Sequence, residues 1–260
     1  MKVALDISPL ENGHVVRGIG SYTKSLLASL EAAQDSEFSV VKLTNHDEKP
    51  EADIIHYPYF DLFFRTLSLK KTIKRVVTVH DVIPLVFPSF FPVGTKGFIN
   101  LFFQKMALKN SDAIICDSKT SKKDIVDKLS IDSKKVHVVY LAPSGIFKKT
   151  KSTDKSIQNK YSLPNDFVLF VGDVNWNKNI TNTLEAIKIS KKHIVMVGKA
   201  LVDDELKETI QINNLIKKLK IGNFVTKTGY VPDEDLVKIY NLAKVTLQPS
   251  FYEGFGLPVL

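Results

Sequence analysis

Short apolar segments alternate with longer amphipathic segments along the chain, and this alternation limits its fold more than any other feature. The pattern predicts a mostly parallel β-sheet whose strands are joined by covering helices. In the first half we expect strands at residues 3–6, 39–43, 54–56, 75–80, 113–116 and 136–139. Right-handed crossovers between them give a doubly wound, Rossmann-like domain.

Two helices can be placed in this half from local signals. Leucines recur at helical spacing within residues 21–33, which predicts an amphipathic helix there. Ser121 has the pattern of an N-terminal cap for a helix that ends at Leu129.

The periodicity fails between Pro143 and Pro164, where polar residues dominate, so we expect a domain boundary in this stretch. The alternation then resumes, with strands expected at 167–172, 194–197, 224–226 and 245–247 and helices at 182–190 and 203–219. The predicted fold class is α/β, with two doubly wound parallel-sheet domains at residues 1–150 and 151–260. We expect the second domain to be incomplete, since little sequence follows its last strand.

The composition excludes several classes of protein. The formal net charge is +8, but the basic runs are scattered and no nucleic-acid motif accompanies them, so we expect no nucleic-acid partner. Cys116 is the single cysteine and lies in an apolar segment, which excludes cysteine-rich metal sites and predicts a core position. We find no signal peptide and no apolar run long enough to cross a membrane, and we expect a cytoplasmic protein.

Aromatic and basic residues gather in the first half, and two explanations remain open. The basic run at residues 70–75 lies near Phe60, Phe63 and Phe64, and a second aromatic cluster follows at residues 87–91 and at Phe98, Phe102 and Phe103. Aromatic and basic residues together could touch a bilayer surface as a peripheral contact. The spacing of Phe98, Leu101, Phe102 and Lys105 also fits a helix that packs its apolar side inward, and we favour this second explanation.

Candidate functional residues follow the predicted strands, where parallel sheets bind ligands. His80 ends a strand and could hydrogen-bond a substrate, or it could be an ordinary turn residue beside Asp81. Gly18 and Gly20 precede the first helix and would let a phosphate or sugar approach its N-terminus, although a tight turn explains them as well.

Two further candidates lie in the second half. Lys178 follows a strand and precedes a helix, which makes it either an anion-binding residue or a solvated loop lysine. Glu253 follows another strand and is flanked by apolar residues, so its carboxylate should accept backbone N–H bonds or hold ligand hydroxyls. Gly254-Phe255-Gly256 continues this loop and should bring backbone close to a ligand.

Taken in order, these loops resemble the retaining glycosyltransferases of family 4. The resemblance is carried by six segments spread over the whole chain: Arg17-Gly18-Ile19-Gly20-Ser21-Tyr22, Val79-His80-Asp81-Val82-Ile83-Pro84, Cys116-Asp117-Ser118, Gly172 with Lys178-Asn179, Gly229-Tyr230-Val231, and Pro249-Ser250-Phe251-Tyr252-Glu253-Gly254-Phe255-Gly256-Leu257-Pro258. It implies the GT-B fold, with the nucleotide-sugar donor held mainly by the C-terminal domain and the acceptor by the N-terminal domain.

The resemblance also implies roles for the candidate residues. His80 and Glu253 would act at the reacting sugar, with Glu253 contacting its hydroxyls. Lys178 would neutralise the diphosphate, and the backbone of Gly254, Phe255 and Gly256 would contact sugar and phosphate. Gly18 and Gly20 would let their loop close over the phosphates.

The implied reaction moves a hexose from a nucleotide-diphosphate sugar to a glycan or lipid-linked acceptor with retention of configuration. GDP-mannose is our first expectation for the donor, and UDP-glucose is close behind. We expect no metal and no other cofactor, because lysine and helix N-termini would offset the diphosphate charge.

Two departures from the family pattern weaken this prediction. Asp173 and Asn177 stand where the family usually has an arginine. The family also has a second glutamate eight residues after the first, and here Leu260 comes just before that position. We therefore expect a truncated chain that turns over poorly. The alternatives are a non-catalytic nucleotide-sugar-binding domain and, less favoured, a nucleotide-sugar epimerase.

Overall fold

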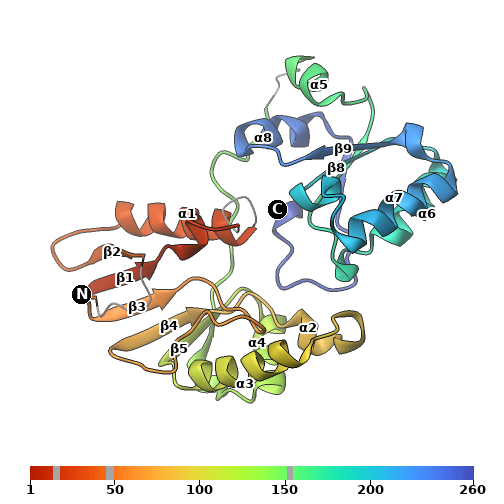
Figure 1. Ribbon diagram of the computed structural model, residues 1–260. Helices are drawn as coiled ribbons and strands as arrows, with labels where there is room; N and C mark the ends of the chain where they lie inside the picture. The colour runs from red at the N-terminus through yellow and green to blue at the C-terminus, as the bar shows by residue number, and fades with distance from the viewer. Residues whose placement is uncertain (14–17, 45–49, 151–154) are drawn as a thin grey trace. The chain divides into compact units, whose positions relative to one another are not determined.

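The protein forms two compact units, Met1–Leu141 and Ala142–Leu260, each built around a parallel β-sheet. The structure is a computed structural model and describes residues 1–13, 18–44, 50–150 and 155–260 (Figure 1). The predicted α/β class with two Rossmann-like domains is confirmed. The units divide between Leu141 and Ala142, a little before the position that the sequence indicated.

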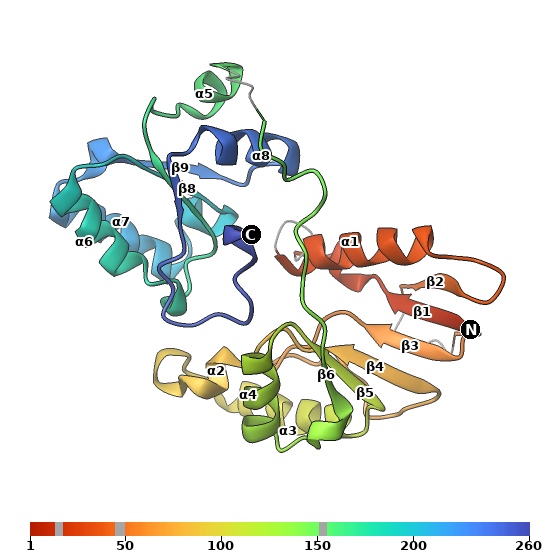
Figure 2. The same cartoon turned by 180° about the vertical axis from the view of Figure 1, so that it is seen from behind.

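The first unit has a six-stranded sheet in the order β2-β1-β3-β4-β5-β6, and every neighbouring pair is parallel. Its strands are β1 (Lys2–Asp6), β2 (Ser39–Leu43), β3 (Ile54–Tyr57), β4 (Lys74–Thr78), β5 (Ala113–Cys116) and β6 (Val136–Val138). Its helices are α1 (Gly18–Ala32), α2 (Ile83–Val86), α3 (Thr95–Lys109) and α4 (Lys119–Leu129). As Figures 1 and 2 show, α1 covers one face of the sheet while α3 and α4 cover the other.

The pairing of β4 with β5 positions the residues that follow both strands. Thr78 pairs with Ile115, and the N–H of Val79 continues the ladder by donating to the Ile115 carbonyl at 2.8 Å. This register brings His80, two residues beyond the end of β4, level with Asp117, the first residue after β5. Cys116 is buried at the end of β5, as expected, and burial raises the pKa of its thiol to about 11.

Two predicted helix starts were wrong. Helix α1 begins at Gly18 and not at residue 21, so Gly20 lies inside its first turn and is buried. Helix α4 is capped by Ser118, whose hydroxyl accepts the N–H of Ser121 at 3.0 Å. Ser118 has the extended backbone of an N-cap, whereas Ser121 already lies within the helix.

The inward orientation favoured for the phenylalanines of α3 was also wrong. Phe98 and Phe102 are 69% and 61% exposed, and the inner face of the helix is formed by Gln104, Ala107 and Leu108. Nearly half of the residues of α3 are large and apolar, and they are spread around the helix, so they cannot all fit on one side of it. The apolar side chains that do not fit against the sheet are exposed to solvent.

The second unit has a four-stranded parallel sheet in the order β10-β7-β8-β9. Its strands are β7 (Val168–Val171), β8 (Ile194–Val197), β9 (Val225–Gly229) and β10 (Val245–Leu247), and its helices are α5 (Lys155–Tyr161), α6 (Ile180–Ser190), α7 (Lys207–Leu219) and α8 (Asp233–Leu242). One core packs the sheet against α6 and α7, and another packs its opposite face against α5 and α8. Strand order reverses at β7, where β10 and β8 flank it, and ligands bind at such switch points.

The backbone segments that follow β7 and β8 lie very close to each other. The N–H of Gly172 donates to the carbonyl of Val197 at 2.9 Å, and Gly198 follows directly. A Cβ atom on Gly198 would stand 2.0 Å from the carbonyl oxygen of Gly172. Only glycine fits there, because the obstacle is backbone that cannot rotate away.

Candidate functional site

Lys178 and Glu253 form an ion pair at the switch point of the second unit. Lys178 ends a short 3₁₀ turn after β7, and Glu253 lies in the loop after β10. The lysine Nζ lies 2.8 Å from Oε1 and 3.0 Å from Oε2 of the glutamate. The side chains are 18% and 21% exposed, so Lys178 is not the solvated loop lysine that the sequence left open.

The bonds to the Glu253 carboxylate are unevenly distributed between its oxygens. Oε1 accepts from Gln248 at 2.7 Å and Ser250 at 2.6 Å in addition to Lys178. Oε2 accepts from Lys178. A carboxylate has about four acceptor positions and an ammonium has three donors. Oε2 and Nζ therefore each retain capacity for a ligand. The donors seen for this glutamate in the described residues are the side chains of Lys178, Gln248 and Ser250, so of the two alternatives the backbone N–H bonds are not seen, and the ligand hydroxyls remain a prediction.

Asparagines fix the Glu253 loop to the segment that follows β7. The Asn177 side chain donates to the Tyr252 carbonyl at 3.0 Å, and the backbone carbonyl of Asn177 accepts from the N–H of Phe251 at 2.8 Å. Asn179 donates to the Pro249 carbonyl at 2.9 Å. Asn177 is buried, so the position where an arginine was expected has instead a residue that joins two loops.

The three residues after Glu253 complete this loop. Gly254 is buried, while Phe255 and Gly256 are partly exposed. Gly256 has φ of 96° and ψ of 39°, a left-handed conformation that glycine adopts without strain, and it caps the short 3₁₀ turn Leu257–Val259. The chain thus turns sharply next to the carboxylate.

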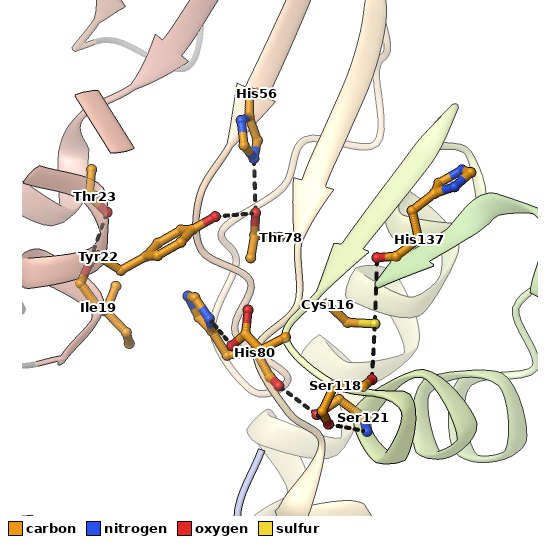
Figure 3. Close-up of polar contacts among 11 residues, drawn as sticks. Ile19, Tyr22, Thr23, His56, Thr78, His80, Cys116, Ser118, Ser121 and His137 are labelled. Carbon is orange, nitrogen blue, oxygen red and sulfur yellow. Dashed lines mark hydrogen bonds and ion pairs between the residues drawn. The ribbon is translucent and has the colours of Figure 1, made fainter. Parts of the chain in front are cut away.

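In the first unit, His80 pairs with Asp117 at the carboxyl edge of the sheet (Figure 3). The Nδ1 atom of His80 lies 2.7 Å from Oδ2 of Asp117. The Asp117 side chain is 4% exposed and that of His80 is 21% exposed. The Ser121 hydroxyl donates to the backbone carbonyl of His80 at 2.9 Å, which fixes the segment that follows β4.

Tyr22, Thr78 and His56 continue this cluster along the sheet (Figure 3). The Tyr22 ring meets the His80 ring edge-on, with centroids 4.7 Å apart, and the Tyr22 hydroxyl lies 3.2 Å from the Thr78 hydroxyl. The same Thr78 oxygen lies 2.9 Å from Nε2 of His56. Burial, with a smaller contribution from the charge of His80, lowers the pKa of His56 to about 4.

The lowered pKa of His56 predicts a loss of stability in acid. Between about pH 6.5 and pH 4 the unfolded chain binds a proton at His56 that the folded chain does not, so stability falls with pH by about 3 kcal/mol across this window. We expect His56→Gln to flatten this part of the curve of unfolding free energy against pH, as measured by urea denaturation. An equal slope in both proteins would show that His56 is not the group responsible.

The glycines predicted near the first helix lie at its start. A Cβ atom on Gly18 would meet nothing within 4 Å. Gly20 is buried within α1, so the backbone there is helical and not a separate loop. Arg17 lies outside the described residues.

The sequence indicated His80, Lys178 and Glu253, but it did not show that Lys178 pairs with Glu253 or that Asp117 pairs with His80. Asp117 was noted only as part of a motif, and Gln248 was not considered. The signal for both pairs was present, because each partner follows a strand adjacent in the sheet. The pairs could be predicted from this signal only with the strand order, and the strand order is not evident from the sequence.

Family models match both units. Residues 16–142 match the model described as Glycosyltransferase Family 4, and residues 152–260 match the model described as Glycosyl transferases group 1.

Several curated relatives are bacterial mannosyltransferases. The serotype-specific mannosyltransferase WbdA of Escherichia coli is 26% identical over 196 residues, which cover 72% of this chain and 24% of WbdA. The O-antigen chain mannosyltransferase B of Escherichia coli is 25% identical over 72% of this chain and 50% of its own length. For RfbU of Salmonella typhimurium the identity is 27%, over 71% of this chain and 48% of RfbU. The chain spans about a quarter to a half of these relatives.

Solved structures share the fold at low sequence identity. Sucrose-phosphate synthase from Thermosynechococcus elongatus superposes with a TM-score of 0.64 at 16% identity, covering 99% of this chain and 77% of the synthase. HepE from Anabaena, solved with UDP-glucose, superposes with a TM-score of 0.64 at 14% identity, covering 96% of this chain and 74% of HepE. Residues 16–142 are therefore similar to Glycosyltransferase Family 4 and residues 152–260 to Glycosyl transferases group 1, and the chain has the fold of the GT-B glycosyltransferases.

Proposed function

We propose that this protein acts as a glycosyltransferase. It would transfer a hexose, with mannose as the first candidate, from a nucleotide-diphosphate sugar to a glycan or lipid-linked acceptor. The single observation that carries the proposal is the Lys178–Glu253 pair at the switch point of the second unit. A cation with a remaining donor suits a diphosphate, and a carboxylate with a remaining acceptor suits a sugar hydroxyl. The mannosyltransferase relatives favour mannose over glucose.

The residue roles follow from this chemistry. Lys178 would contact the diphosphate and Oε2 of Glu253 would accept from a sugar hydroxyl, while Gly254, Phe255 and Gly256 let the backbone turn close to the ligand. His80 would contact the reacting sugar. Gly18 leaves open space at the start of α1, where a phosphate would meet the helix N-terminus.

We further propose that the anomeric configuration is retained. The bond between the sugar C1 and the phosphate oxygen breaks, a bond from C1 to an acceptor hydroxyl oxygen forms on the same face, and the leaving diphosphate takes the acceptor proton. The protein would supply orientation and charge stabilisation, which is why no strong base is required. Proton NMR of the product's anomeric signal would decide between retention and inversion.

Calorimetric titration with GDP-mannose, UDP-glucose and UDP tests the proposal. It should be run on this chain and on the protein encoded by the whole reading frame. We expect one nucleotide sugar to bind, and we expect the protein encoded by the whole reading frame to transfer the sugar to an acceptor. Binding without transfer would favour the non-catalytic domain, conversion of the sugar without an acceptor would favour an epimerase, and no binding by a folded protein would contradict the whole proposal.

An exposed apolar face on α3 favours a second component of the function, peripheral contact with an anionic membrane. Its apolar members are Phe98, Ile99, Phe102 and Met106, all exposed, and Phe64 is exposed in a loop that packs against the same helix. Lys96 and Lys109 are exposed on the same helix, which has no aspartate or glutamate over its whole length. Exposed aromatic side chains flanked only by cations suit anionic lipid better than a protein surface of mixed charge.

The loop that carries Phe64 is held against α3 by side chains of the helix. Oε1 of buried Gln104 accepts the N–H groups of Thr66 at 2.8 Å and Leu67 at 3.0 Å. Asn100 donates to the Phe63 carbonyl at 2.9 Å. The α3 face is therefore pre-formed, so little ordering would be required when it meets a bilayer. In the described residues no helix is both long and apolar enough to span one.

Substituting both exposed phenylalanines tests this membrane contact. The protein should sediment at low salt with vesicles of phosphatidylglycerol and phosphatidylcholine, and the double variant Phe98→Ser, Phe102→Ser should bind at least about tenfold more weakly. Ile189→Ser is the matched control, because Ile189 is 83% exposed but lies on α6. No sedimentation at low salt, or equal sedimentation of the double variant, would refute the contact.

A further inference from the structure

We infer that Asp117 is a positioning residue for His80: its carboxylate determines which ring nitrogen carries the proton, so that Nε2 presents a lone pair to a ligand hydroxyl. The inference about the proton concerns the first unit alone. Its consequence for transfer rests on the proposed function, in which His80 contacts the sugar.

The hydrogen-bond geometry fixes the arrangement of protons. An ionised carboxylate only accepts hydrogen bonds, so the contact of 2.7 Å between Oδ2 and Nδ1 requires a proton on Nδ1. In the neutral ring Nε2 is then unprotonated. Free histidine has no such constraint, and loss of the carboxylate would let the proton move to Nε2.

The surroundings hold both side chains in this relation. The register Thr78 to Ile115 places the two residues level beyond paired strands, and Ser121 fixes the His80 backbone through the carbonyl. The Tyr22 ring limits rotation of the His80 ring by meeting it edge-on at 88°. Asp117 is 3% exposed, so its carboxylate has little room to turn toward water.

Two atoms of the pair remain to be satisfied by a ligand. Nε2 of His80 and Oδ1 of Asp117 are buried, and neither has a hydrogen-bond partner among the described residues. Buried polar atoms are nearly always bonded, and both of these are acceptors. The ligand that completes them must therefore donate hydrogen bonds, as the hydroxyls of a sugar do and an unprotonated phosphate oxygen does not.

Nitrogen NMR of the histidine rings measures the tautomer directly. In the ¹⁵N-labelled chain at neutral pH we expect the proton of neutral His80 on Nδ1, and in Asp117→Ala we expect it to move largely to Nε2. Ser121→Ala is the matched control, because it removes the bond to the His80 carbonyl and leaves the ring contact intact. A proton on Nε2 in the unsubstituted chain, or an unchanged tautomer in folded Asp117→Ala, would overturn the inference.

A double-mutant cycle separates positioning from a purely structural role. In the protein encoded by the whole reading frame, Asp117→Ala should lower kcat/KM at least about tenfold. In the His80→Ala background it should cause no further loss. An equal loss in both backgrounds would show that Asp117 does not act through His80. If none of these proteins transfers sugar, the proposed function fails, while the NMR result still decides the role of Asp117.

Discussion

Replacing Lys178 by methionine should weaken binding of the nucleoside diphosphate about 10- to 150-fold, because a charge-assisted hydrogen bond is worth about 1.5–3 kcal/mol. Methionine has nearly the same length but no charge, so the shape of the turn after β7 is kept. The effect should be equal for the diphosphate alone and for the nucleotide sugar, since Lys178 is expected to touch only the phosphates. Calorimetric titration with both ligands measures it.

Lys188→Met is the matched control, since this lysine is exposed on the neighbouring helix α6. Glu253→Gln provides the complementary result. It should weaken binding of the nucleotide sugar more than that of the diphosphate alone, because the glutamate is assigned to the sugar hydroxyls. If Lys178→Met binds normally while remaining folded, its ion pair with Glu253 is structural and the diphosphate is held elsewhere.

Gly198→Ala should destabilise the second unit by about 3 kcal/mol or more, the range of a severe steric change in a packed interior. The added Cβ would stand 2.0 Å from the Gly172 carbonyl oxygen, and either β7 or β8 must shift to relieve the overlap. Because Lys178 and Glu253 depend on the ends of β7 and β10, ligand binding should weaken as well. Urea denaturation followed by circular dichroism measures the loss.

Gly222→Ala is the matched control for this substitution. A Cβ atom on Gly222 would meet nothing within 4 Å, and its backbone does not have a positive φ. Its unfolding free energy should change by no more than about 0.5 kcal/mol. Comparable destabilisation in both variants would show that the contact with the Gly172 carbonyl oxygen is not the cause.

Buried parallel strands were predictable because their signal is local. Strands β2, β5, β8 and β10 have the bounds that the apolar runs indicated. Helix α8 was not predicted, and α5 lies in the stretch interpreted as a boundary, since a few polar residues can hide a helix that packs by one side. The orientation of α3 was wrong for a related reason: spacing shows that a helix has an apolar side, but not whether the sheet covers it.

The residues of the candidate site were also predictable only in part. His80, Lys178 and Glu253 could be selected as polar residues directly after strands. The pairing could not be predicted, because the pairs Lys178–Glu253 and His80–Asp117 depend on which strands are neighbours. The roles proposed for these residues remain predictions for the experiments above.

The strand order β10-β7-β8-β9 has a consequence for how the second unit is made. Lys178 and Glu253 are 75 residues apart in the chain, and β10 leaves the ribosome after β7, β8 and β9. At about 5–20 residues per second, translation takes roughly 4–15 s to pass from one to the other. During that interval the free edge of β7 can pair with other nascent chains. We therefore expect slow codons before residue 245 to lower the yield of folded protein.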